Sequence, residues 1–133
     1  MTQEADVVLA NNAAFNDRDV EAMLALYAVD AVVVDRRQLG LGQFNGHGEL
    51  RPYYSSIFGA VDALREDIRI LAERDGVVVT HCETWARLPG DATGAGITTP
   101  YGLIVHVRDG RIARLEVYND GRDALAESGL SLA

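Results

Sequence analysis

The feature that most constrains the fold is the segment over residues 15–37, FNDRDVEAMLALYAVDAVVVDRR. Its apolar spacing predicts the end of one amphipathic helix, a break at which Asp19 caps a second helix of about two turns, and a β-branched strand over 31–35. A helix pair that leads directly into a strand is typical of chains whose helices and sheet share one core. Asp35 closes the strand, and a carboxylate at a strand end beside a cavity is a candidate catalytic acid or base.

The remainder of the chain predicts one more helix and then a series of strands. The helix is expected over 49–59, after a glycine-containing loop or short ribbon over 36–48. The strands are expected over 64–75, 77–88, 98–108 and 111–118. Helices followed by an antiparallel meander indicate an α+β fold with the helices against one face of a curved sheet. The length of 133 residues predicts a single domain over 1–133.

The charge balance argues against two classes of partner. The net charge is −8, whereas a nucleic-acid binder or a protein that docks on anionic lipid needs a basic face. No apolar run approaches the roughly 20 residues that cross a bilayer, and the N-terminus lacks the basic and apolar regions of a signal peptide. We therefore expect a cytoplasmic protein whose partner is a small apolar molecule.

The sequence predicts neither a metal nor an organic cofactor. Cys82 is the single cysteine, so neither a disulfide within the chain nor a cysteine-based zinc site is expected. The three histidines do not have the spacing of metal ligands. The four glycines of the 40–48 segment do not form the GxGxxG motif that opens a helix in dinucleotide-binding proteins.

The strand over 77–88 carries further candidate site residues, with His81 and Glu83 as catalytic groups and Trp85 as a substrate-binding residue. Strict alternation puts one set of side chains on a common face: Val79, His81, Glu83 and Trp85. If Trp85 faces the interior, His81 and Glu83 face it too, and a carboxylate could then hold a histidine base in its tautomer. If that face is outside, the same residues belong to an outer sheet surface used in a dimer. Alternation alone does not decide between the two.

Other side chains are expected to line a pocket and bind substrate. On the last two strands these are Tyr101, Leu103, Val117 and Asn119, which alternation places on one face of each strand. Aromatic residues nearer the N-terminus are expected in the core, where their hydroxyls could reach the pocket: Tyr27, Tyr53, Tyr54 and Phe58.

Three stretches of the chain together resemble a known superfamily. They are AAFNDRDVEAMLALYAVDAVVVD, the segment FNGHGELRPYY, and VHVRDGRIARLEVY. They are similar to the nuclear transport factor two-like superfamily, and within it to the SnoaL-like polyketide cyclases and the ketosteroid isomerases. The resemblance covers residues 4–120 and implies a cone-shaped fold, in which a curved antiparallel sheet wraps around N-terminal helices and encloses an apolar pocket. It also implies a homodimer.

The resemblance implies roles for individual residues. Asp35 stands where the ketosteroid isomerases keep their general base, whereas Asn11 and Leu103 stand where they keep two oxyanion donors. Val117 stands where the SnoaL-like cyclases keep an aspartate on the last strand. Asp35 is therefore the one familiar catalytic position that this chain retains.

A third group of the same superfamily, the polyether epoxide-opening cyclases, is similar around LYAVDAVVVD and LRED. Those enzymes pair the aspartate at the end of the first strand with an acidic residue after the third helix. The resemblance implies that Asp35 pairs with Glu66 or Asp67. Two carboxyl groups in one water-poor pocket titrate at different pH, which provides an acid and a base side by side.

The sequence therefore predicts a cofactor-independent acid–base enzyme that acts on an apolar, oxygenated small molecule of the kind made in secondary metabolism. Cyclisation, isomerisation and epoxide opening are the expected reactions. Asp35 is the expected acid or base, with a partner from a set of four residues: Glu66, Asp67, His81 and Glu83. The alternative is a non-catalytic ligand-binding or dimerisation domain, in which Asp35 pairs with an arginine and the pocket holds no second titratable group.

Overall fold

The structure is a computed structural model that describes residues 2–37, 40 and 42–132. In chain order its elements are α1 (Gln3–Asn16), α2 (Val20–Leu26), β1 (Tyr27–Asp35), β2 (Gly42–Asn45), α3 (Gly46–Gly59), β3 (Ala63–Arg74), β4 (Val77–Arg87), β5 (Ile97–Arg108), β6 (Arg111–Tyr118) and α4 (Gly121–Ser128). The predicted α+β order, with helices first and the long strands afterwards, is confirmed. Asp19 caps α2 as predicted, because its carboxylate accepts a hydrogen bond from the backbone N–H of Ala22 at 3.0 Å.

The six strands form one mixed sheet in the order β2-β1-β6-β5-β4-β3. The neighbours from β3 to β6 are antiparallel, as predicted, but β1 runs parallel to β6. The expectation of a purely antiparallel sheet is therefore wrong for the pairing of β1 with β6. Because α3 and several strands separate β1 from β6 in the sequence, the connection is long enough for the two to run in the same direction.

The segment around the first strand differs in two ways from the prediction. β1 begins at Tyr27 instead of residue 31, because Tyr27 adopts an extended backbone (φ −102°, ψ 143°) and ends α2. The loop or ribbon predicted over 36–48 contains β2, which pairs with β1 from Val32 opposite Asn45 to Asp35 opposite Gly42. Residues 38, 39 and 41 of that prediction lie outside the described residues.

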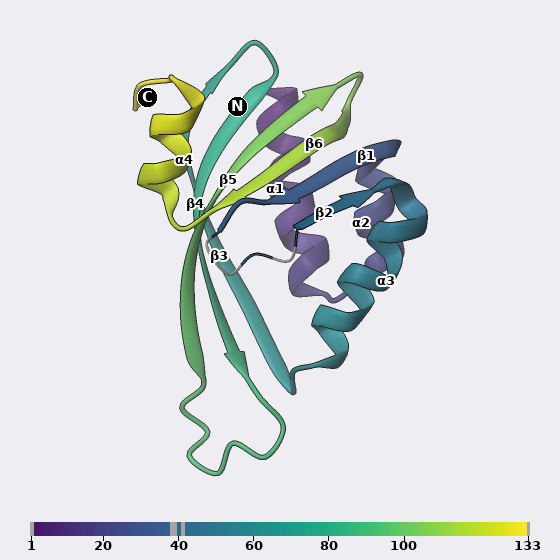
Figure 1. Cartoon of the computed structure of the whole chain (residues 1–133), viewed down its shortest axis with the longest axis vertical. Helices are drawn as coiled ribbons and strands as arrows, with labels where there is room; N and C mark the ends of the chain where they lie inside the picture. The colour runs from purple at the N-terminus through teal and green to yellow at the C-terminus, as the bar shows by residue number, and fades with distance from the viewer. Residues whose placement is uncertain (1, 38–39, 41, 133) are drawn as a thin grey trace.

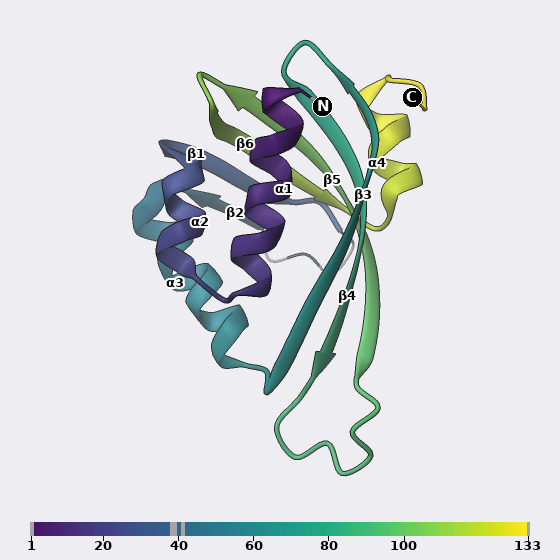
Figure 2. The same cartoon turned by 180° about the vertical axis from the view of Figure 1, so that it is seen from behind.

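The two faces of the curved sheet carry different helices. α1, α2 and α3 lie together on one side, whereas α4 lies on the other (Figures 1 and 2). The larger hydrophobic core fills the space between the first three helices and the sheet, and a smaller core lies under α4. This arrangement confirms the cone-shaped α+β fold, in which the interior of the cone faces α1–α3.

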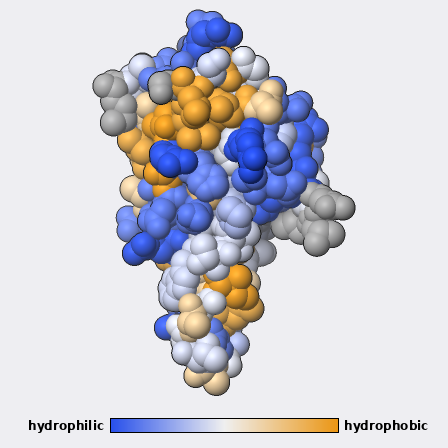
Figure 3. Space-filling model, turned by 90° about the vertical axis from the view of Figure 1, so that its left-hand side faces the viewer, coloured by the Kyte–Doolittle hydropathy of each residue, from blue (hydrophilic) through white to orange (hydrophobic). Residues whose placement is uncertain are grey.

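The surface on the α4 side is hydrophilic over much of its middle, and apolar atoms gather at its upper end and on the arm below (Figure 3). The arm is the connection between β4 and β5, and Figure 1 shows that it extends beyond the helices. Leu88 and Ile97, at the two ends of this connection, are 48% and 58% exposed. No helix among the described residues is long and apolar enough to cross a membrane.

The C-terminal helix α4 packs against the outer face of β4 and β5 at two glycines. A side chain at Gly102 would collide with the backbone carbonyl of Asp120, which caps α4. A Cβ atom at Gly121 would lie 2.5 Å from the Cβ of His81. The backbone of α4 therefore comes so close to the sheet that only glycine fits at these positions.

We predict that Gly102→Ala lowers the free energy of unfolding by about 1–3 kcal/mol, since the added methyl group must displace the backbone at Asp120. Gly48→Ala is the matched control, because no atom lies within 4 Å of a Cβ at this position of α3. The control should raise the free energy of unfolding by about 0.5–1 kcal/mol. Urea denaturation of both variants measures the difference, and equal stabilities would contradict the packing described here.

Candidate functional site

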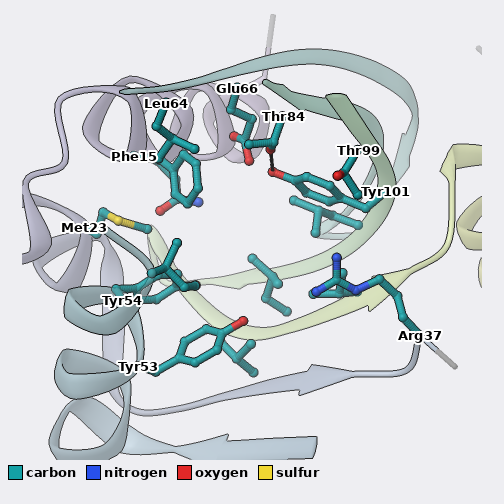
Figure 4. A pocket seen from close by; sticks show the side chains of 16 residues that line it. Phe15, Met23, Arg37, Tyr53, Tyr54, Leu64, Glu66, Thr84, Thr99 and Tyr101 are labelled. Atoms are coloured by element: carbon teal, nitrogen blue, oxygen red, sulfur yellow. Dashed lines mark hydrogen bonds between the residues drawn. The ribbon is translucent and has the colours of Figure 1, made fainter. Parts of the chain in front are cut away.

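A cavity of about 290 Å³ lies between the N-terminal helices and the interior face of the sheet (Figure 4). Side chains of α1, α2 and α3 form one wall, and side chains of the strands form the other. Its polar lining consists of Asn11, Arg37, Glu66, two threonines and three tyrosines, and the rest is apolar. An apolar cavity with a few converging polar groups is the usual form of a small-molecule site.

The cavity brings together seven of the predicted site residues: Asn11, Tyr53, Tyr54, Glu66, Tyr101, Leu103 and Val117. Nine further lining residues were not predicted: Phe15, Met23, Val33, Arg37, Ile57, Leu64, Thr84, Thr99 and Leu115. The alternation of side chains along the strands could have identified two of them. Leu64 lies two residues before Glu66 on β3, and Thr84 lies two residues after Cys82 on β4, so each shares a strand face with a residue that points inward. Arg37 carried no such signal, since arginine after a strand usually faces solvent.

Four predicted binding residues lie elsewhere, and the fourth, Trp85, is on β4. Tyr27 and Phe58 are buried in the core without lining the cavity, and the Tyr27 hydroxyl is 2.9 Å from that of Tyr54. Asn119 is exposed and follows the end of β6, so the alternation that placed it inside no longer applies. Strand and helix patterns thus located the core correctly but not its boundary with the cavity.

Of the two orientations that alternation left open for His81, Glu83 and Trp85, the structure has the outward one. Their face of β4 is the outer one, because Cys82 and Val78 lie in the core beneath α1–α3, while Val79 lies in the core beneath α4. The ring of His81 accepts a hydrogen bond at Nδ1 from the backbone N–H of Gly121 in α4, at 3.0 Å. None of the three lines the cavity.

Trp85 and Glu83 occupy the part of this outer face that α4 leaves open. The indole of Trp85 donates a hydrogen bond to the backbone carbonyl of Ala95 in the β4–β5 arm, at 2.9 Å. Glu83 is exposed. Both residues therefore lie on an outer sheet surface, which was one of the two possibilities that the sequence pattern of this strand allowed.

The LRED segment divides between the two faces of β3. Asp67 lies on the outer face, where its side chain is 70% exposed and 3.1 Å from the guanidinium of Arg65. Glu66 lies on the inner face, is 6% exposed and lines the cavity. Of the two acids that the epoxide-cyclase resemblance offered, only Glu66 is placed to meet a ligand.

Two asparagines of α1 hold Glu66 in place. Asn12 donates from Nδ2 to the Glu66 carboxyl at 2.9 Å and to its backbone carbonyl at 3.0 Å. Asn16 accepts from the Glu66 backbone N–H at 2.6 Å and donates to the same backbone carbonyl at 3.0 Å. The Glu66 carboxyl is therefore held by the Asn12 amide, and its backbone by both asparagines. No cation among the described residues forms an ion pair with this carboxyl.

Burial raises the pKa of Glu66 from 4.5 to about 7, and the hydrogen bond from Asn12 only partly opposes this. The physical cause is the cost of placing a negative charge in an apolar cavity without a countercharge. At neutral pH the carboxyl therefore exists in both protonation states, which suits a group that both accepts and donates a proton.

Asp35 lies at the end of β1, as predicted, but it is not among the residues that line the cavity. Its side chain is wholly buried and binds Arg37 through two parallel hydrogen bonds, from Nε at 2.9 Å and from Nη2 at 2.6 Å. The backbone N–H of Arg37 also donates to this carboxylate at 3.1 Å. The two-point contact fixes the plane of the guanidinium, and Arg37 rather than Asp35 reaches the cavity.

Tyrosines surround the Arg37 end of the cavity. The guanidinium carbon lies 5.9 Å from the ring centre of Tyr101, whose hydroxyl accepts a hydrogen bond from Thr84 at 3.0 Å. Figure 4 shows Arg37 across the cavity from Phe15 and Met23, with the Tyr53 hydroxyl turned toward the interior. Burial and the charge of Asp35 raise the pKa of Tyr53, so this phenol stays protonated and can donate a hydrogen bond.

The described residues contain no group of three or more His, Cys, Asp or Glu side chains that could hold a metal ion. Among the described residues, the cavity lining offers one carboxyl, one guanidinium, and hydroxyl and amide groups.

The sequence matches the family model of the SnoaL-like domain over residues 8–115. The chain therefore belongs to the SnoaL-like domain family, which confirms the resemblance seen in the sequence. A search of curated proteins found no match.

Solved structures share the fold over nearly the whole chain. A putative polyketide cyclase from Xanthomonas campestris pv. campestris is 26% identical, with a TM-score of 0.71 over 93% of this chain and 95% of that one. A protein from Catenulispora acidiphila with a ketosteroid isomerase-like fold, in complex with trimethylamine, is 20% identical, with a TM-score of 0.74 over 93% and 92%. An LEH-like epoxide hydrolase from M. tuberculosis is 17% identical, with a TM-score of 0.69 over 93% and 87%. These likenesses confirm the fold.

We predict that Glu66 makes the stability of the protein depend on pH. Since its folded pKa lies above its unfolded value of 4.5, the folded state holds the proton more tightly, and stability is lost as pH rises from 4.5 to about 7. The loss amounts to about 3 kcal/mol and levels off at higher pH.

The measurement is urea denaturation of the wild type and of Glu66→Gln between pH 4 and 9. Glu66→Gln removes the titrating group, so the difference in stability between the two proteins should change across this pH window. Asp67→Asn is the matched control, because its carboxyl is exposed on the opposite face of β3. A difference between wild type and Glu66→Gln that stays constant from pH 4 to 9 would contradict the raised pKa.

Proposed function

We propose that this protein is a cofactor-independent acid–base enzyme that isomerises or cyclises a small, largely apolar carbonyl compound, with Glu66 as the group that moves the proton. The observation that carries this proposal is a buried, cavity-lining carboxyl that accepts a hydrogen bond from the Asn12 amide and whose pKa burial raises to about 7. Belonging to the SnoaL-like family supports the reaction class. The Xanthomonas protein similar to this chain, a putative polyketide cyclase, supports it as well.

Glu66 and Arg37 divide the work in this proposal. The Glu66 carboxylate removes a proton from a carbon next to the substrate carbonyl, and the C–H electron pair moves to the carbonyl oxygen, which becomes an enolate. Arg37 stabilises that oxygen, because its guanidinium reaches the cavity in a fixed orientation. Asp35 then acts as a positioning residue behind Arg37.

The Glu66 carboxylic acid completes either reaction with the proton that it has taken. In an isomerisation it returns the proton to a carbon conjugated with the enolate. In a cyclisation the enolate carbon attacks a second carbonyl of the same molecule, and the oxygen of that carbonyl receives the proton. Both reactions need only one carboxyl group to take up and return the proton. Epoxide opening by a carboxyl pair needs a second acid, whereas Glu66 is the one carboxyl among the described cavity-lining residues.

The non-catalytic alternative from the sequence fits half of what is observed. Asp35 pairs with an arginine, as that alternative requires, but the cavity does hold a second titratable group in Glu66. A test of proton transfer separates the two, and it does not depend on knowing the natural substrate.

We predict that the protein catalyses the elimination of 5-nitrobenzisoxazole, a general probe for a base in an apolar cavity. The base takes the C3 proton, the C–H pair forms the nitrile, and the N–O bond breaks to release a coloured phenolate. Because only ionised Glu66 removes the proton, kcat/KM should rise with pH and level off above an apparent pKa of about 7.

Glu66→Gln should lower kcat/KM about a hundredfold, the usual contribution of a positioned base, while Asp67→Asn should keep the wild-type value. Phenolate absorbance measures both. Equal rates for wild type and Glu66→Gln would reject the role of Glu66 and favour a binding domain.

We predict that Asp35→Asn keeps the pH midpoint of the same reaction near 7, because Glu66 and not Asp35 is the base. Disappearance of the pH-dependent rate in a folded Asp35→Asn variant would instead assign the base to Asp35. If Asp35→Asn leaves Arg37 without its countercharge and does not fold, the double variant Asp35→Asn/Arg37→Gln replaces the ion pair by two amides and answers the same question.

A further inference from the structure

The three tyrosines that line the cavity differ in whether their hydroxyls have partners. The Tyr54 hydroxyl pairs with that of Tyr27 at 2.9 Å, and the Tyr101 hydroxyl accepts a hydrogen bond from Thr84 at 3.0 Å. No hydrogen bond among the described residues involves the Tyr53 hydroxyl, and its oxygen is not one of the buried side-chain atoms that lack a partner. The Tyr53 hydroxyl is therefore accessible, and Figure 4 shows it turned toward the interior of the cavity.

Two aromatic neighbours hold the ring of Tyr53 in place. The ring stacks on that of Phe44 in β2, with centroids 4.1 Å apart and planes 24° from parallel, and its centroid lies 5.0 Å from that of Tyr54. Because a phenol oxygen lies on the axis about which the ring turns, this packing fixes the oxygen and leaves only its hydrogen to rotate. The hydroxyl is thus a donor that is in position before a ligand enters, which makes a hydrogen bond most effective in catalysis.

Arg37 reaches the cavity from the side opposite to this hydroxyl. Its Nε and Nη2 bind Asp35, while no hydrogen bond among the described residues involves Nη1. In Figure 4 the guanidinium and the Tyr53 hydroxyl both point into the space between them. The charge of Arg37 is also felt at Tyr53, where it opposes the rise in pKa that burial causes. One charged and one neutral donor that face the same space are suited to an oxygen that carries negative charge.

We infer that Tyr53 is a further catalytic residue, whose hydroxyl donates a hydrogen bond to the same substrate oxygen that Arg37 stabilises. The ligand is then a carbonyl compound, or a phenolate that resembles its enolate, with this oxygen between Tyr53 and Arg37. Its apolar body extends toward Glu66, which Figure 4 shows across the cavity from Tyr53. This inference rests on the proposed function, since it adds a residue to the same site.

A second donor affects both the reaction and the choice of ligand. The oxygen carries more negative charge in the enolate than in the carbonyl compound, so the hydrogen bond from Tyr53 strengthens as the proton moves to Glu66. A ligand without an oxygen at this position leaves the Tyr53 hydroxyl and the Arg37 guanidinium with no acceptor. Such a mismatch discriminates between ligands more strongly than lost apolar contact does.

The test compares two ligands by isothermal titration calorimetry at pH 6. One is the product of the elimination, 2-hydroxy-5-nitrobenzonitrile, and the other is 3-nitrobenzonitrile, the same molecule without its hydroxyl. At this pH the product is a phenolate, because its nitro and nitrile groups make the phenol acidic, and Glu66 mostly carries its proton. We predict that the wild type prefers the phenolate, and that Tyr53→Phe reduces this preference about tenfold to a hundredfold, since a hydrogen bond to a charged oxygen is lost.

Two controls separate binding from folding. Tyr53→Phe keeps the ring and its stacking on Phe44 and removes no hydrogen bond between described residues, so it should keep the wild-type free energy of unfolding in urea. Tyr118→Phe is the matched variant, because the Tyr118 hydroxyl lies on β6 outside the cavity, 3.5 Å from Glu116. It should keep the wild-type preference for the phenolate.

Two results would overturn the inference: a phenolate preference that is the same in Tyr53→Phe and the wild type, or a wild type that shows no preference for the phenolate. Neither touches the proposed function, which stands if the elimination still depends on Glu66. Conversely, a preference that depends on Tyr53, in a protein whose Glu66→Gln variant eliminates at the wild-type rate, would keep the oxygen site and reject Glu66 as the base.

Discussion

The structure depends on the contact between α1 and β3. Asn12 and Asn16 lie one turn apart on α1 and together make four hydrogen bonds to Glu66, three of them to its backbone. These bonds join the first helix to an outermost strand of the sheet, and they also hold the one cavity-lining carboxyl among the described residues. The same hydrogen bonds therefore support both the fold and the site, because Glu66 connects α1 to the sheet and is also the residue whose pKa is raised.

The two acids near the cavity show how burial assigns different roles to the same chemical group. Asp35 is wholly buried beside a guanidinium, which satisfies its charge and fixes the arginine. Glu66 is buried beside an amide, which cannot balance a negative charge, so its proton is retained to higher pH. A buried carboxylate with a cation organises structure, and one without a cation is available for proton transfer.

The sequence predicted the fold well because hydrophobic periodicity is a local signal. The second helix, its Asp19 cap and the long strands followed directly from apolar spacing. The parallel neighbour of β6 was missed, because strand pairing depends on contacts between distant segments. The homodimer and the cytoplasmic location stay predictions.

The site was predicted less well, for a related reason. Alternation placed His81 and Glu83 on one face of their strand, but only tertiary packing decides which face is inside. Arg37 was the clearest omission. Its position follows from a two-point ion pair with Asp35, and no pattern of apolar residues encodes such a pair.

The anchoring of Glu66 by α1 has a consequence for the whole protein. Whenever α1 separates from β3, the Glu66 carboxyl loses its hydrogen bond from Asn12 and gains water, and the gain of water lowers its proton affinity. By linkage, protonation of Glu66 must then hold α1 more tightly against the sheet. Amide hydrogen exchange in α1 is thus a remote reporter of the charge in the cavity.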